Sequence, residues 1–292
     1  SYDIPYIQTS YTVETYDDQG APLHTATRTV EFNELGNPIF KEDPLGNQTI
    51  YVRDSRMNIT RKEIWEDQGG PQLVLGYAEE KTYDAQDNVL TYPEAEGFSE
   101  ERTTTYTYDE AGNLTLEHAP GNTRTSYSWD DENRNTKLTI PGGGITTMAY
   151  RHDGLRVRKE TASATTKFIY DGQNYLLETD GSDSVKRVLT NEPMGYGNLI
   201  SQRFLVSGST WGTVWHHYDA LGSTRQITNV SAQVGNSYGY TAWGEAISAL
   251  TSVILPNSFR WIGMLGYYFD DEADTYYVRA RHYDPIRWSH GL

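Results

Sequence analysis

A short turn pattern recurs along this chain and constrains its fold more than any other feature. In most copies an aromatic residue precedes Asp or Asn, and Gly or Asn follows three or four residues later, although the copy at Asp43 lacks the aromatic residue. The aromatic residues at positions 83, 108, 129, 150 and 170 are separated by 25, 21, 21 and 20 residues. A nearly fixed period of this length is typical of stacked units. It suits one β-hairpin per unit and is too short for a pair of helices.

The spacing within the pattern has a physical reason. Asp or Asn at the first position of a turn accepts hydrogen bonds from backbone N–H groups, and Gly at the fourth adopts the left-handed conformation that closes a short hairpin loop. The turn pairs are Asp17 and Gly20, Asn33 and Gly36, Asp43 and Gly46, and Asp109 and Gly112. Because the residues between turns alternate as strands do, we predict an all-β fold. Its hairpins stack into a curved or spiral sheet, a partial cocoon.

Composition limits both the core and the partners. Apolar residues make up only 37% of the 292 residues, but there are 23 Tyr and 7 Trp. Aromatic rings with polar edges must therefore fill much of the interior, and some could stack on a cell-surface glycan. The net charge of −16 argues against binding to nucleic acid or anionic lipid. It is explained by solubility or, alternatively, by attraction to a basic partner. The longest apolar run, Ala246–Leu255, is too short for membrane insertion.

The sequence predicts neither a metal site nor a cofactor. There is no Cys, so disulfides and thiolate ligands are excluded. His216 and His217 are adjacent and would face opposite sides of a strand, and the seven His show no metal-ligand spacing. No phosphate-binding or dinucleotide-binding motif is present.

Two further expectations concern organisation. The segment Glu245–Leu255, bounded by Gly244 and Pro256, is the single candidate for a short helix. We also predict a boundary near residue 200, with a hairpin array over residues 1–200 and a denser aromatic region over residues 201–292.

The stretch Thr275–Pro285 alternates as a strand does and ends at the turn Asp284-Pro285. On one strand, Arg279 and Arg281 would lie on the same face. Such a face needs partners, and we expect ion pairs with the acidic run just before it. That run comprises Asp270, Asp271, Glu272 and Asp274.

This stretch resembles the end of the core region of RHS/YD-repeat proteins. Three upstream segments, residues 217–225, 238–244 and 259–263, match the same family in the family's order. The motif residues are Tyr218, Asp219, Gly222, Arg225, Trp243, Gly244, Tyr276, Tyr277, Arg279, Arg281, Tyr283 and Pro285. The resemblance implies a β-sheet that spirals into a hollow shell, sealed by the core segment and holding a toxic polypeptide of the same chain.

The resemblance also implies a candidate reaction. Many members of the family cut the toxin free by an aspartyl protease activity, and Asp284 lies where the core Asp stands in them. A partner carboxylate would come from Asp270, Asp271 or Asp274; otherwise Asp284 caps the turn before Pro285. The family pattern is incomplete here, because residues 287–289 look like a remnant and the second Asp-Pro is absent.

From these observations we predict a non-enzymatic shell or scaffold that encloses or carries a polypeptide cargo, or presents an extended extracellular surface. The alternatives are a surface adhesin or self-assembling fibre subunit, possibly glycan-binding, and an aspartyl autoprotease that releases a C-terminal toxin. The partners would be a polypeptide cargo or other copies of the chain. We expect a secreted or surface location after passage through the cytoplasm. The chain lacks an initial Met, as expected of a piece of a longer protein.

Overall fold

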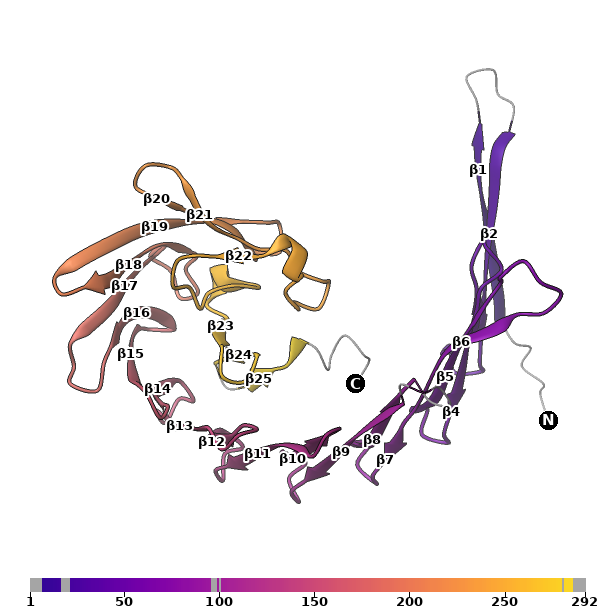
Figure 1. Ribbon diagram of the computed structural model, residues 1–292, viewed down its shortest axis with the longest axis horizontal. Coiled ribbons are helices and arrows are strands. Elements are labelled where there is room, and N and C mark those ends of the chain that lie inside the picture. The colour runs from indigo at the N-terminus through magenta and orange to yellow at the C-terminus, as the bar shows by residue number, and fades with distance from the viewer. Residues whose placement is uncertain (1–6, 17–21, 96–98, 100, 280, 286–292) are drawn as a thin grey trace. The chain divides into compact units, whose positions relative to one another are not determined.

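The computed structural model describes residues 7–16, 22–95, 99, 101–279 and 281–285. The described chain is almost entirely β-structure, as predicted (Figure 1). It divides into two compact units, residues 1–124 and 125–292. The predicted boundary near residue 200 remains a prediction.

Unit 1 is an antiparallel array in which successive strands pair. The short strand β7 (Thr82–Tyr83) pairs with β8 (Val89–Glu94), which also pairs with β6 (Val74–Glu80). Its other strands are β1 (Ile7–Tyr16), β2 (Pro22–Phe32), β3 (Pro38–Glu42), β4 (Gln48–Arg53), β5 (Ile59–Glu66), β9 (Arg102–Tyr108) and β10 (Leu114–Ala119).

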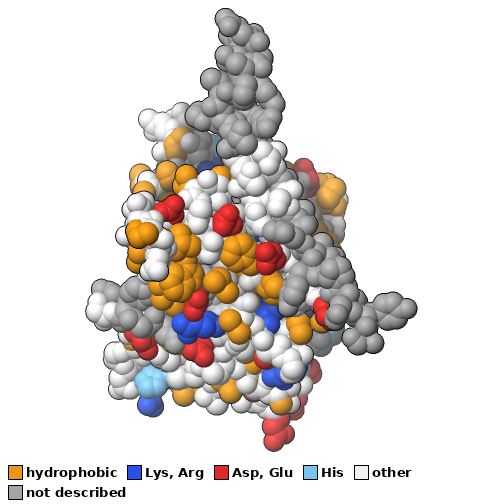
Figure 2. All heavy atoms as spheres, turned by 90° about the vertical axis from the view of Figure 1, so that its right-hand side faces the viewer, with side chains coloured by type: hydrophobic (Ala, Val, Ile, Leu, Met, Phe, Trp, Pro, Cys, Tyr) orange, Lys and Arg blue, Asp and Glu red, His pale blue; other side chains and the backbone are white. Residues whose placement is uncertain are grey.

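Much of the apolar surface of unit 1 stays half-exposed. Among its described residues, the buried hydrophobic side chains are Ala78, Val89 and Tyr92. Figure 2 shows hydrophobic side chains at the surface, interspersed with acidic and basic ones. Lysines stack on tyrosine rings between strands, with Lys41 lying 5.2 Å from the ring of Tyr51. Such contacts contribute roughly 0.5–1 kcal/mol each at exposed sites.

Unit 2 contains a second antiparallel array and a separate three-stranded sheet. The array runs from β11 to β22, each strand pairing with the next. Its strands are β11 (Thr123–Trp129), β12 (Asn135–Thr139), β13 (Ile145–Tyr150), β14 (Arg156–Glu160), β15 (Thr165–Asp171), β16 (Asn174–Thr179), β17 (Val185–Asn191), β18 (Leu199–Ser207), β19 (Thr210–Tyr218), β20 (Thr224–Asn229), β21 (Val234–Ser237) and β22 (Ser252–Val253). The small sheet is β23 (Tyr268–Asp270), β24 (Thr275–Val278) and β25 (Arg281–Tyr283), and two 3₁₀ turns, η1 (Ser248–Leu250) and η2 (Gly263–Leu265), complete the unit.

The turns show the geometry that their spacing demands. In the Asn33 turn, Oδ1 accepts the N–H groups of Leu35 at 3.1 Å and Asn37 at 2.9 Å, and Gly36 has a φ of +78°. The turns at Asp43, Asp109 and Asp219 repeat these contacts, with left-handed Gly46, Gly112 and Gly222. The predicted copy at Asp17 and Gly20 lies outside the described residues.

The aromatic residue before the turn ties one hairpin to the previous one. The hydroxyl of Tyr83 donates to the carbonyl of Ile59 at 2.8 Å, and that of Tyr218 to the carbonyl of Leu199 at 2.6 Å. Tyr150 and Tyr170 do the same, and in all four cases the acceptor is the first residue of a strand. The repeated Tyr therefore satisfies its own hydroxyl while fixing the spacing of successive hairpins.

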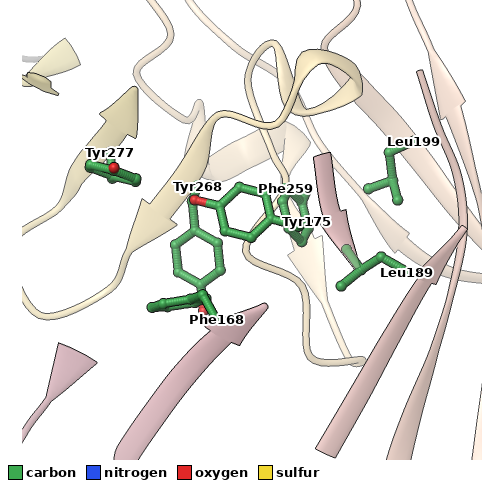
Figure 3. Close-up of a cluster of buried hydrophobic side chains, with 7 residues drawn as sticks. All are labelled: Phe168, Tyr175, Leu189, Leu199, Phe259, Tyr268 and Tyr277. Atoms are coloured by element: carbon green, nitrogen blue, oxygen red, sulfur yellow. The ribbon is translucent and has the colours of Figure 1, made fainter. Parts of the chain in front are cut away.

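The small sheet packs against the array to form the main core. Figure 1 shows β11–β22 curling around β23–β25. Seven buried side chains meet there, four from β15–β18 and three from the C-terminal segment (Figure 3). They are Phe168, Tyr175, Leu189, Leu199, Phe259, Tyr268 and Tyr277. The hydroxyl of Thr224 on β20 donates to the carbonyl of Phe259 at 2.7 Å, which adds a polar link to the apolar contact.

Two local predictions are wrong. The helix expected over Glu245–Leu255 is only the 3₁₀ turn η1, followed by strand β22. The Asn236 side chain accepts the N–H groups of Ile254 and Leu255, each at 2.8 Å, so they are engaged outside any helix. The single strand expected over Thr275–Pro285 is a hairpin, because Val278 pairs with Arg281 and Arg279 is left-handed with a φ of +55°.

Candidate functional site

A buried ionic cluster joins β14 to the C-terminal sheet. Arg156 is the first residue of β14, and its side chain is 0% exposed. Its Nη1 and Nη2 lie 2.6 and 3.0 Å from the two carboxylate oxygens of Asp270, at the end of β23. This bidentate geometry is the strongest form of the arginine–carboxylate contact.

A second cation completes the cluster. Lys159 Nζ lies 3.0 Å from Oδ1 of Asp270 and 3.0 Å from Oε2 of Glu272. Burial raises the pKa of Asp270, but the charges of Arg156 and Lys159 outweigh it and bring this pKa to about 2. The carboxylate is therefore ionised at neutral pH and acts as a fixed anion rather than as a proton carrier.

Aromatic rings enclose the Arg156 guanidinium. Its centre lies 5.1 Å from the ring of Phe168, 5.3 Å from that of Tyr268 and 4.3 Å from that of Tyr277. The Tyr277 hydroxyl accepts the backbone N–H of Arg156 at 2.8 Å and donates to the carbonyl of Gly154 at 3.0 Å. The cluster thus fixes β24 as well as β23 to the start of β14.

A β-bulge explains why the sequence did not reveal this pair. Ala149 pairs with Arg158 but Tyr150 pairs with Arg156, so β14 carries one extra residue. The bulge turns Arg156 to the buried side that Lys159 also faces, whereas Arg158 stays exposed. Strict alternation places Arg156 and Arg158 on one face, and no local signal links Arg156 to a residue 114 positions away.

The acidic run therefore has other partners than those predicted. Asp270 and Glu272 pair with residues of β14, and Asp271 pairs with Arg260 at 2.6 Å. Arg279 instead donates to the carbonyl of Leu265 and lies over the ring of Tyr196. Arg281 is exposed and forms no salt bridge within the described part of the chain. The expected ion pairs of Arg279 and Arg281 are wrong because the hairpin separates the two arginines.

The other motif residues occupy structural positions. Tyr276 is 1% exposed, and the ring of Tyr283 stacks on Trp261 at 4.9 Å. Gly244 is left-handed, and a Cβ there would lie 2.4 Å from the Trp261 ring. Tyr277 and Pro285 are buried, Asp219 and Gly222 form a turn, and Trp243 and Arg225 are exposed.

Asp270 does not suit the acid pair that an aspartyl mechanism needs, and the role of Asp284 stays a prediction. Two carboxylates that share a proton require one strongly raised pKa, whereas the pKa of Asp270 is lowered. Asp271 is exposed and paired with Arg260. Burial raises the pKa of Asp274, and Asp284 lies half-buried just after β25. The proposed remnant at residues 287–289 lies outside the described residues.

Within the described residues, no group of three or more His, Asp or Glu side chains is placed to hold a metal ion. No helix among those residues has the length and hydropathy needed to cross a bilayer.

His216 gives unit 2 a predicted dependence on pH. Its side chain points inward, 7% exposed, and neither ring nitrogen has a hydrogen-bond partner in the described structure. Burial, aided by the charges of Arg187 and His217, lowers the pKa of His216 from 6.5 to about 3. The unfolded state therefore binds a proton first as pH falls. The contribution of neutral, buried His216 to the stability of the folded state is therefore complete above about pH 6.5, and it is lost as the pH falls below that value.

We expect the free energy of unfolding to fall by about 2 kcal/mol from this residue between pH 7 and pH 5. Urea unfolding at the two pH values measures it. His216→Phe should remove this loss, whereas His217→Phe, at an exposed ring bonded to Thr228, should retain it. An equal pH dependence in wild type and His216→Phe would contradict the assignment.

Comparison with known proteins places these features in a wider context. No family model matches the chain. Over 183 residues the chain is 31% identical to the tRNA3(Ser)-specific nuclease WapA of Bacillus spizizenii and 30% identical to the tRNA nuclease WapA of Bacillus subtilis. It is 22% identical over 203 residues to the double-stranded DNA deaminase toxin A of Burkholderia cenocepacia. The matches cover 61–62% of this chain but only 7% of each nuclease and 14% of the deaminase toxin.

Solved toxin structures match the chain at low similarity, as two examples show. A Photorhabdus luminescens Tc holotoxin pore gives a TM-score of 0.42 at 13% identity, covering 94% of this chain and 18% of that chain. A TcdB2-TccC3 complex gives a TM-score of 0.43 at 13% identity, covering 94% and 19%.

The curated relatives correct the functional prediction. They are named as nucleases and as a deaminase toxin, so the prediction of a non-enzymatic shell or scaffold is wrong. The names of these relatives also stand against the adhesin, fibre-subunit and autoprotease alternatives. Composition and turn spacing report how the chain folds, and they contained no signal for the activity of its relatives.

Proposed function

We propose that this chain is part of an enzymatic toxin that acts on nucleic acid. The similarity to the WapA tRNA nucleases over 183 residues is the observation that carries the proposal. The match to a DNA deaminase toxin supports it, because that protein also acts on nucleic acid. We take tRNA as the first substrate to test, since three of the relatives are named for it.

We further propose that the chain belongs to the RHS/YD-repeat proteins and is secreted. The regular Asx turns, the tyrosine hydroxyls that tie successive hairpins and the four C-terminal motif segments support this assignment. In such a protein the buried Arg156–Asp270 pair would hold the C-terminal sheet in place.

Charge suggests where the nucleic acid meets the enzyme. The chain carries 40 acidic and 24 basic residues, and such a balance repels phosphates. We therefore propose that the substrate is bound by a part of the longer toxin outside the residues described here. The match covers only 7% of each nuclease, so most of each of those proteins lies outside it and could contain such a part.

The test uses the full-length protein that contains this chain, and the 292-residue chain beside it. Each is incubated with total tRNA and with double-stranded DNA. Cleavage is read on denaturing gels and deamination by sequencing. We expect the full-length protein to cleave or deaminate one of these substrates. We expect the chain alone to bind tRNA no more tightly than on the order of 10 µM at physiological salt. A folded full-length protein that leaves both nucleic acids unchanged would overturn the proposal.

A further inference from the structure

An open hollow lies along strands β18–β20 of unit 2. It has a volume of about 570 Å³ and is formed by β18, β19 and β20 with the loop before β18. Its apolar lining includes Trp215, Ile200 and Val230, whose residues are 38%, 44% and 74% exposed, together with Leu199 and Met264. The exposed indole of Trp215 therefore lines the same hollow as two exposed aliphatic side chains.

Polar side chains also line this hollow. The Asn198 side chain donates to Oε2 of Glu192 at 2.8 Å, and Nε2 of His217 lies 2.9 Å from Oγ1 of Thr228. These groups already hold one another in place, and they retain lone pairs and N–H groups for a ligand. A ligand with hydroxyl groups suits such a mixed set, because a hydroxyl both donates and accepts.

The charge of the hollow limits what it can bind. No Lys or Arg is among the described residues that line it, and Glu192 contributes a carboxylate. A phosphate, a sulfate or a nucleic-acid backbone would therefore meet repulsion rather than a partner. A strongly apolar ligand would keep much of its surface in water, because the hollow is open. What remains is a neutral ligand with one apolar face and polar edges.

We propose that this hollow is a binding site for a neutral oligosaccharide. The C–H face of a pyranose ring would pack on the indole of Trp215, as amphipathic aromatic residues favour. Its hydroxyls would meet Glu192, Asn198 and His217 at the edges. This inference does not rest on the proposed nucleic-acid activity and can fail separately from it.

Isothermal titration calorimetry with cellotetraose and chitotetraose tests the proposal on the whole chain. We expect one of them to bind with a Kd on the order of 1 mM. Trp215→Ala should weaken that binding at least tenfold, and Trp215→Phe should restore part of it. Trp243→Ala is the matched control, because this indole is 51% exposed but lies outside the hollow. It should change the Kd less than twofold.

Two further probes separate the saccharide from other occupants. Pentalysine tests a cationic peptide drawn to Glu192, and a heparin oligosaccharide tests an anionic glycan. The proposal is overturned if neither neutral tetrasaccharide binds, or if Trp215→Ala and Trp243→Ala weaken binding equally. It is also overturned if pentalysine or heparin binds at Trp215 more tightly than the neutral sugars. Thermal unfolding of each variant shows whether a loss of binding comes from a loss of fold.

Discussion

Replacing Arg156 with methionine is expected to lower the free energy of unfolding by about 3–5 kcal/mol. Methionine keeps most of the apolar stem of the side chain but removes the guanidinium group and its charge. Asp270, 4% exposed, would then keep Lys159 as its one salt-bridge partner among the residues that the structure describes. An incompletely paired carboxylate in a buried site is costly.

Urea unfolding followed by tryptophan fluorescence measures this effect, since six of the seven tryptophans lie in residues 125–292. Arg158→Met is the matched control. Arg158 lies two residues away on the same strand, and it pairs with Glu160 where both side chains are nearly half-exposed. Its loss should cost less than about 1 kcal/mol. Equal losses in the two variants would mean that burial of the Arg156 pair is unimportant.

Tyr277→Ala is expected to lower the free energy of unfolding of unit 2 by about 3–5 kcal/mol, as for other fully buried aromatic residues. Tyr277 is 0% exposed and belongs to the main core cluster. Its removal would leave a cavity beside the Arg156 guanidinium, 4.3 Å from the ring centre. The same urea experiment measures the loss.

Tyr277→Phe separates the hydroxyl from the ring. It keeps the packing but leaves the N–H of Arg156 and the carbonyl of Gly154 without their shared partner. We expect a smaller loss of about 1–3 kcal/mol. Tyr196→Ala is the exposed control, because Tyr196 is 57% exposed and contacts Arg279. It should cost less than about 1 kcal/mol. A Tyr277→Ala variant as stable as Tyr196→Ala would contradict the packing described here.

The turns were the part of the fold that local sequence could predict. An Asx side chain, a left-handed Gly and a preceding Tyr act within a few residues, so their spacing is readable. Even so, the turn at Asp54 escaped notice, because Met57 stands where Gly would and takes a φ of +73°. The better signal was Asn four residues after Asp, as in the turn that ends at Asn58.

The buried cluster could not be predicted for two physical reasons. The bulge in β14 reverses the face of Arg156, so strict alternation assigns that side chain to the wrong face. The partner Asp270 lies on a different sheet, so only the curl of unit 2 brings the two together. The alternation of residues 275–283 was read correctly as β-structure, but it did not reveal the two-residue turn that makes a hairpin.

A double-mutant cycle on Arg156 and Asp270 tests most directly that this pair joins the C-terminal sheet to the array. Arg156→Met, Asp270→Leu and the double variant are unfolded in urea under one set of conditions. The account predicts a coupling energy of at least about 2 kcal/mol, with the double variant more stable than the sum of the single losses implies. Losses that add to within about 0.5 kcal/mol would show that the two side chains do not interact and would contradict the account.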